Sequence, residues 1–102
     1  MTTCAYYIFF TNLSNKLKIN IIQSLRKKER SVGEIVNGLK MEQSKVSHAL
    51  ASLKYCSIVK SKQKGKQRIY YLNKETIIPI LNLIDRHEKK SCKLCMKKRL
   101  GK

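Results

Sequence analysis

Acidic residues are scarce in this sequence. Asp and Glu together number six among 102 residues, against 23 Lys and Arg, which gives a formal net charge of +17. So few carboxylates leave little from which to build an acid–base pair, and the sequence shows neither a Ser/His/Asp set nor a glycine-rich phosphate loop. We therefore expect that the protein is not an enzyme, and nothing in the sequence indicates a small-molecule substrate.

Long apolar runs and proline are also rare. The longest bulky stretch, AYYIFF (Ala5–Phe10), is far shorter than a membrane helix and lacks the basic leader of a signal peptide. We expect a cytoplasmic protein without a membrane partner. With one Pro, no internal repeat and no linker, the sequence predicts one domain over residues 1–90 and a basic, Cys-containing tail over residues 91–102.

Positive charge is the strongest feature that the chain does have. A surface this basic repels itself unless a polyanion binds it. Nucleic acid is the leading candidate, and an anionic membrane surface is the second. A lysine-rich composition explains part of the excess of bases, but it does not explain the scarcity of acids.

The first half of the chain predicts three helices. The first, near Cys4–Asn12, is apolar on every side, which indicates a subunit interface because so small a protein cannot cover it alone. The second lies within residues 13–28, with Ser14 or Asn15 as its N-cap. The third lies within residues 30–40. Its start is marked by a capping box, with Ser31 as N-cap and Glu34 at N3, and Gly38 near its end is a stop signal.

The second half predicts a helix, a hairpin and a final helix. Apolar spacing at the helical period gives a helix over Gln43–Tyr55, and alternation then gives strands over Ile58–Lys62 and Gln67–Leu72 around Lys64-Gly65. The final helix begins near Ile77 or Ile78, with Pro79 in its first turn. The fold class is therefore mainly α with a small β-hairpin, in the order α-α-α-α-β-β-α of a winged helix-turn-helix.

The helix over Gln43–Tyr55 has an exposed face that is small, polar and neutral. A helical wheel places Val46, Ala49, Leu50 and Leu53 toward the core, with Ala51 and Tyr55 among the residues opposite. Short side chains let a helix approach base edges in the major groove, while flanking lysines reach phosphates. An ordinary surface helix that happens to carry serines is the alternative. The predicted DNA-binding residues of this recognition helix are Gln43, Ser44, Lys45, Ser47, His48 and Lys54.

The hairpin carries five positive charges without an intervening acid. A wing of this kind adds affinity that does not depend on sequence and falls with salt. Lysines that protect an exposed sheet edge from aggregation are the alternative. The predicted DNA-binding residues of the wing are Lys60, Lys62, Lys64, Lys66 and Arg68.

Together these motifs resemble the ArsR-type (ArsR/SmtB) winged helix-turn-helix transcriptional repressors over Phe9–His87. The segment FFTNLSNKLKINIIQSL is similar to the family's "F..LS.P.R..IL..L", with Lys18 where Arg is usual. The segment QSKVSHAL is similar to "QS.VSHHL", with Ala49 in place of a common second His, and KGKQRIYYL is similar to the family's wing. The resemblance implies a homodimer held by the first and last helices, which reads an inverted repeat in double-stranded DNA as a repressor.

Many proteins of that family release DNA when a metal binds. One family site on the third helix would fall on Ser31 and Gly33, which cannot form it. A second site, on the last helix, is matched in its first half by Asp85 and His87, and its second half falls on non-ligating residues in the tail. The resemblance therefore implies an incomplete metal sensor.

The tail offers a different set of ligands. Two Cys separated by two residues, Cys92 and Cys95, can chelate Zn²⁺ with His87, and Cys4 completes the set if the first and last helices pack together. Alternatively, the surrounding lysines favour thiolates, so that Cys92 and Cys95 form a redox pair. Two inert thiols in a basic tail are the third alternative.

Three functions are compatible with this sequence. The first is a sequence-specific transcriptional regulator, which is metal- or redox-responsive if the tail is a sensor. The second is an architectural protein that coats DNA with weak sequence preference. The third is a protein-interaction module that kept the winged fold. The neutral face of the helix over Gln43–Tyr55 favours the first, because a coating protein has no need to keep that face free of lysine.

Overall fold

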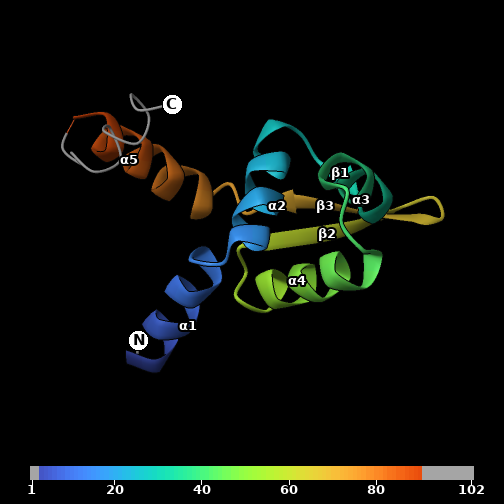
Figure 1. The fold of residues 1–102 in the computed structure, drawn as a ribbon, viewed down its shortest axis with the longest axis horizontal. Helices are drawn as coiled ribbons and strands as arrows, with labels where there is room; N and C mark the ends of the chain where they lie inside the picture. The colour runs from blue at the N-terminus through green and yellow to red at the C-terminus, as the bar shows by residue number, and fades with distance from the viewer. Residues whose placement is uncertain (1–2, 91–102) are drawn as a thin grey trace.

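The computed structural model describes residues 3–90 and confirms the winged helix-turn-helix arrangement (Figure 1). Within these residues the elements are α1 (Thr3–Leu13), α2 (Lys16–Lys27), β1 (Arg30–Ser31), α3 (Val32–Leu39), α4 (Gln43–Tyr55), β2 (Val59–Lys64), β3 (Gln67–Leu72) and α5 (Ile77–Lys90). The bounds of α4 and β3 are those that the sequence predicts. Pro79 lies in the first turn of α5, where its missing N–H costs no helical hydrogen bond.

The sheet has one strand more than the sequence predicts. Its order is β1-β3-β2, with both pairs antiparallel. Strand β1 has only two residues, too few to show an alternating pattern, and it pairs with the middle of β3. Strand β2 begins one residue later than expected and continues to Lys64, where it pairs with Gln67 across the turn. Gly65 in that turn has a φ of +63°, a conformation that glycine adopts without strain.

Side-chain caps fix the starts of α2 and α3 as predicted. The Asn15 side chain accepts a hydrogen bond from the Lys18 backbone N–H at 3.0 Å. The Glu34 N–H donates to Ser31 Oγ at 3.2 Å, and the Ser31 N–H donates to the Glu34 carboxylate at 2.9 Å, which completes the capping box. That hydrogen bond from the Ser31 backbone is the main reason why the pKa of Glu34 lies below its ordinary value.

Gly38 lies near the end of α3, as predicted, but it does not cap the helix. Helix α3 continues through Gly38 to Leu39 and ends at Lys40, whose φ of 54° is left-handed. The Lys40 N–H donates to the Val36 carbonyl at 2.8 Å and so satisfies one of the last carbonyls of the helix. Glycine is the usual residue at this left-handed position, whereas here a lysine takes it.

The core lies where α2, α3 and α4 pack on one face of the hairpin. Its fully buried side chains are contributed by every layer and include Ile21, Ile22, Ile35, Leu50, Leu53, Ile58 and Ile77. The predicted inward face of α4 is confirmed, since Val46, Ala49, Leu50 and Leu53 are all buried. This packing fixes which face of α4 remains available to solvent.

Helices α1 and α5 extend from the same end of the molecule and diverge from one another (Figure 1). Both carry large exposed apolar side chains. On α1 these are Tyr6, Tyr7, Ile8 and Phe10, and on α5 they are Leu83 and Ile84. Phe10 is 60% exposed and Tyr7 is 74% exposed, so the protomer leaves uncovered much of the apolar first helix.

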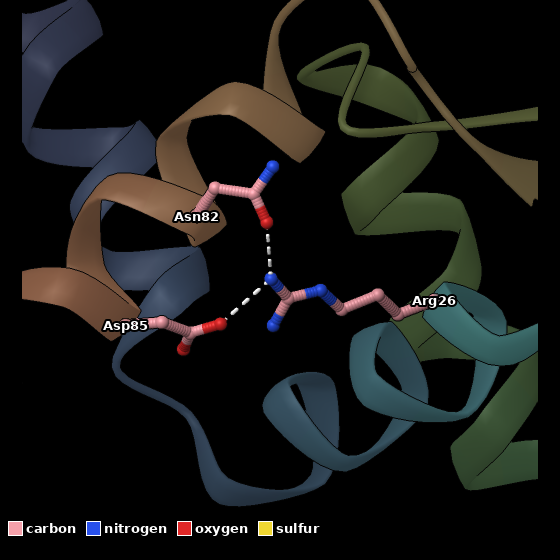
Figure 2. Close-up of polar contacts among 3 residues, drawn as sticks. All are labelled: Arg26, Asn82 and Asp85. Atoms are coloured by element: carbon pink, nitrogen blue, oxygen red, sulfur yellow. Dashed lines mark hydrogen bonds and ion pairs between the residues drawn. The ribbon is translucent and has the colours of Figure 1, made fainter.

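A polar clamp joins α5 to α2. The Arg26 guanidinium donates to Asn82 Oδ1 at 2.7 Å and lies 2.7 Å from an Asp85 carboxylate oxygen. Figure 2 shows the guanidinium directed between these two side chains of α5. Together with the buried Ile77 and Leu81, this clamp fixes the start of α5 against the core.

Candidate nucleic-acid interface

The outward face of α4 is the centre of the candidate interface. Ser44, Ser47 and His48 are all exposed, as are Ala51 and Tyr55 further along the helix. Residues 46–53 contain no Lys, Arg, Asp or Glu. A helix that presents hydroxyls, an imidazole and a methyl group can approach base edges closely and offers them both donors and acceptors.

The two ends of α4 carry the residues that would contact phosphates. Lys45 and Lys54 are exposed near opposite ends of the helix, and Gln43 is exposed in its first turn. Lys45 lies 3.5 Å from Glu42, a contact between two solvent-exposed side chains that contributes little. The Glu42 side chain makes no cap hydrogen bond, so the first N–H groups of α4 are not satisfied by it.

A hollow of about 460 Å³ separates α4 from the start of α2. Ser44, Lys45 and His48 line its α4 side, and Asn15, Leu17 and Lys18 line its α2 side. Three of the predicted DNA-binding residues therefore face one shared concave surface. This surface follows the N-terminal half of α4, which is the part of a recognition helix that usually reaches the bases.

The hairpin divides its charges between its two faces. Cross-strand partners share a face, and Lys60 pairs with Tyr71, Lys62 with Ile69 and Lys64 with Gln67. Arg68 pairs with Gln63 on the opposite face, where its guanidinium donates to Ser61 Oγ at 3.3 Å. All five predicted wing residues are exposed.

Lys62 differs from the other wing cations because it already has an anionic partner. Its Nζ lies 2.9 Å from a Glu29 carboxylate oxygen and 5.5 Å from the centre of the Tyr71 ring. The hydrogen bond from Lys62 is the main reason why the pKa of Glu29 lies below its ordinary value, and the charges of Lys64 and Lys74 add to the effect. Sequence reasoning missed this pairing, because Glu29 lies far from the hairpin along the chain and no local pattern joins them.

The predicted metal and redox residues are only partly within the described region. Cys92 and Cys95 lie outside the described residues, so their role stays a prediction. Among residues 6–89, whose side chains the structure describes, no three His, Cys, Asp or Glu come together in a group able to hold a metal ion. His87 is exposed on α5, whereas Cys4 belongs to α1, which diverges from α5 within the protomer (Figure 1).

Asp85, the other residue of the incomplete family site, is bound to Arg26. In the described part of the chain, none of the helices is both long enough and apolar enough to cross a bilayer.

The comparisons with known proteins agree with this fold. Residues 15–61 match the family model described as bacterial regulatory protein, arsR family. This match contains α2, α3, α4 and the start of β2. No curated protein matches the chain.

Solved structures extend the similarity over most of the chain. Mycobacterium tuberculosis Rv0081 is 28% identical, covers 76% of this chain and 79% of its own, and superposes with a TM-score of 0.72. HlyU from Vibrio cholerae is 24% identical, covers 82% of this chain and 91% of its own, and has a TM-score of 0.73.

A third structure is described as the homodimeric winged helix-turn-helix DNA-binding domain of Mb0332 from Mycobacterium bovis. It is 18% identical, covers 87% of this chain and 85% of its own, and has a TM-score of 0.73. The family match over the helix-turn-helix and the shared fold over the remaining elements lead to one conclusion: the chain has the winged helix-turn-helix fold, and its residues 15–61 are similar to the arsR family of bacterial regulatory proteins.

Proposed function

We propose that the protein is a homodimeric repressor that recognises an inverted repeat in double-stranded DNA through the exposed face of α4. The observation that carries this proposal is the neutral, polar face of α4 in a chain with a net charge of +17. The direct contacts to bases are assigned to Gln43, Ser44, Ser47 and His48. Contacts to phosphates are assigned to Lys45 and Lys54 and to the wing residues Lys60, Lys62, Lys64, Lys66 and Arg68.

The exposed apolar side chains of α1 and α5 support the homodimer. Tyr6, Tyr7 and Phe10 on α1 lie more than half exposed, as does Leu83 on α5. Burial of such surface against a second copy removes it from water, which is the main driving force for a stable subunit interface. The structural relative Mb0332 is described as homodimeric, and the same arrangement here would pair two α4 helices across a two-fold axis.

Selection of binding sites from a random pool of double-stranded DNA tests this proposal directly. The purified protein is used at two salt concentrations, and its mass in solution is measured by analytical ultracentrifugation. We expect a dimer that enriches an inverted repeat whose half-sites are centred about one helical turn, roughly 34–36 Å, apart. A monomer, or a pool that remains random, would contradict the proposal.

An architectural, DNA-coating function is the second candidate. The observation that favours it is the hairpin, where four exposed cations other than Lys62 have no carboxylate partner among the described residues. This function predicts that all sequences are retained equally and are released together as salt rises. The same selection experiment therefore separates the two candidates.

Regulation through the tail is a separate part of the proposal. The tail would act in one of two ways. It would bind Zn²⁺ through Cys92, Cys95 and His87, with Cys4 from either protomer, or it would form a disulfide between Cys92 and Cys95. Either event would change the end of α5 and thereby the dimer interface. The selection is repeated with Zn²⁺, with a chelator, and with and without reductant. Binding that is the same in all four conditions would remove the tail from the model.

A further inference from the structure

Three helices meet at a small polar cluster beneath the candidate interface. We call this cluster the polar joint, and it consists of Asn12 from α1, Lys18 from α2 and Ser52 from α4, with Cys56 at the end of α4. Asn12 is only 3% exposed, whereas most of its neighbours on α1 are open to solvent. A buried amide of this kind is costly unless each of its polar atoms has a partner.

Every polar atom of the Asn12 side chain does have a partner. Its Oδ1 accepts from the Lys18 ammonium at 2.7 Å and from the Ser52 hydroxyl at 2.8 Å, and its Nδ2 donates to Cys56 Sγ at 3.0 Å. The Lys18 ammonium also lies 3.2 Å from Ser52 Oγ, which closes a triangle among the three helices. A charged donor makes these hydrogen bonds shorter and stronger than bonds between neutral groups.

The polar joint connects two surfaces that have different roles. Asn12 is near the end of α1, the helix that carries the exposed aromatic side chains. Ser52 is half-buried near the end of α4, on the flank between its buried and its outward face. A rotation of α1 against α4 would break the bonds to Asn12 from both other helices. The joint therefore restricts the angle between the dimerisation surface and the face that reads DNA.

We propose that Asn12, Lys18 and Ser52 are positioning residues that set the separation and orientation of the two α4 helices in the dimer. This inference rests on the proposed function, because it states that the joint determines which spacing between the two half-sites the dimer prefers. Two recognition helices can occupy successive major-groove segments only at a fixed separation, so a loosened joint relaxes the choice of spacing. The joint itself does not touch DNA in this proposal.

A direct contact between Lys18 and a DNA phosphate is the competing role. Lys18 lines the hollow that Ser44, Lys45 and His48 also face, so the two roles need a test that separates them. The geometry points to the joint, because the ammonium is within hydrogen-bonding distance of oxygens on two other helices. A phosphate contact predicts a loss of affinity for every DNA and a salt slope lower by ~1.

The experiment measures the affinity of the full-length protein for a series of inverted repeats whose half-site spacing varies in steps of one base pair. The variants Ser52→Ala and Lys18→Met break the joint from two different helices, and Lys18→Arg restores a charged donor. The matched controls are Ser24→Ala, a half-buried helical serine outside the joint, and Lys16→Met, an exposed lysine in the first turn of α2. Dimer mass and melting temperature are measured for each.

We expect the wild-type protein to prefer one spacing by about tenfold or more, the change in affinity that ~1.4 kcal/mol gives. In Ser52→Ala and Lys18→Met, that preference should fall to about twofold, while dimer mass and affinity for an isolated half-site stay at the wild-type level. The change follows from the loss of a charge-assisted hydrogen bond. Lys18→Arg and both controls should keep the wild-type preference.

Three other outcomes would overturn the inference, and they differ in whether the proposed function is refuted as well. A wild-type preference that both joint variants retain, or a Lys18→Met variant that loses affinity equally at every spacing, would refute the joint alone. A wild-type protein that binds every spacing and every sequence equally would refute the proposed function together with the joint.

Discussion

The outward face of α4 and the hairpin are both exposed, but their chemistry is opposite. Between Lys45 and Lys54, α4 has no charged residue and presents hydroxyl, imidazole and methyl groups. The hairpin places five cations between Lys60 and Arg68 without an acid. The first surface suits contacts that depend on the base sequence, and the second suits contacts with a uniform phosphate backbone.

This difference shows how a very basic protein can still discriminate among DNA sequences. A helix crowded with lysine would be drawn to any phosphate, and its long side chains would hold the backbone away from the base edges. Cations are absent from the outward face of α4 and lie on the hairpin and at the ends of α4, an arrangement that suits a separation of affinity from specificity. The first three of the following predictions each change one surface and leave the other intact, and the last two concern stability.

The largest effect is expected when the α4 face is altered. In Ser47→Ala/His48→Ala, discrimination between the selected site and random DNA should fall, because a good base contact is worth about 1–3 kcal/mol. Affinity for random DNA should remain close to that of the wild type. Competition binding against both DNAs measures the two quantities. A double variant that discriminates as well as the wild type would exclude these side chains from base recognition.

A second, smaller effect is expected at the tip of the hairpin. In Lys64→Ala/Lys66→Ala, affinity should fall by a similar factor for selected and random DNA, because both lysines are proposed to contact phosphates. The slope of log affinity against log salt should become shallower by up to ~2 units. Titrations at four salt concentrations measure the slope. Lys40→Ala is a suitable control, since Lys40 is exposed outside both surfaces.

A third effect distinguishes Lys62 from its neighbours on the hairpin. Because Lys62 is paired with Glu29 at 2.9 Å, Lys62→Ala should change the salt slope by less than Lys66→Ala does. In a Glu29→Gln background the Lys62 ammonium is freed, and its removal should then change the slope by ~1 unit. If Lys62→Ala changes the salt slope by the same amount in the wild type and in the Glu29→Gln background, the ion pair does not compete with DNA.

The same pair has a defined pH dependence. The pKa of Glu29 is lowered in the folded protein, mainly by its hydrogen bond from Lys62. Its contribution to stability is therefore fully present above the ordinary carboxyl pKa of 4.5 and is lost as pH falls through the lowered value. Between pH 5 and 8, the difference in melting temperature between wild type and Glu29→Gln should stay constant, and below about pH 4.5 it should shrink.

The smallest effect on DNA binding is expected for a cap that lies outside both surfaces. Ser31→Ala removes the hydroxyl that accepts from the Glu34 N–H and should lower the free energy of unfolding by about 1 kcal/mol. Urea denaturation measures this loss. At temperatures where the variant is folded, the preferred sequence and the salt slope should both equal those of the wild type.

Local signals in the sequence were sufficient for most of the fold. The period of Val46, Ala49, Leu50 and Leu53 predicts both the bounds and the orientation of α4, because the apolar side of an amphipathic helix must face the core. Asn15 and Ser31 predict helix starts through bonds to residues three positions along the chain. Gly38 indicates the end of α3 to within one residue, but it does not identify the cap, because Lys40 adopts the conformation that glycine usually supplies.

Contacts between distant segments could not be predicted in the same way. The strand β1, the Arg26 clamp and the pair Lys62–Glu29 each depend on how elements pack, and none has a local pattern. The polar joint is similar, since Asn12 gives no sign in sequence that it lies beneath α4. The residues of the candidate interface were identifiable because they share one short helix and one hairpin.

The uncovered aromatic side chains of α1 have a consequence for how the protein responds to its own abundance. A protomer that presents one α4 helix reads a single half-site, and two protomers must meet before the whole operator is held. Below the concentration at which the subunits pair, occupancy of the operator rises with the square of the protein concentration, and above it the rise becomes linear. In the proposed homodimer, the side chains of Tyr7 and Phe10 would therefore set a threshold, so that a modest change in synthesis would switch a promoter sharply.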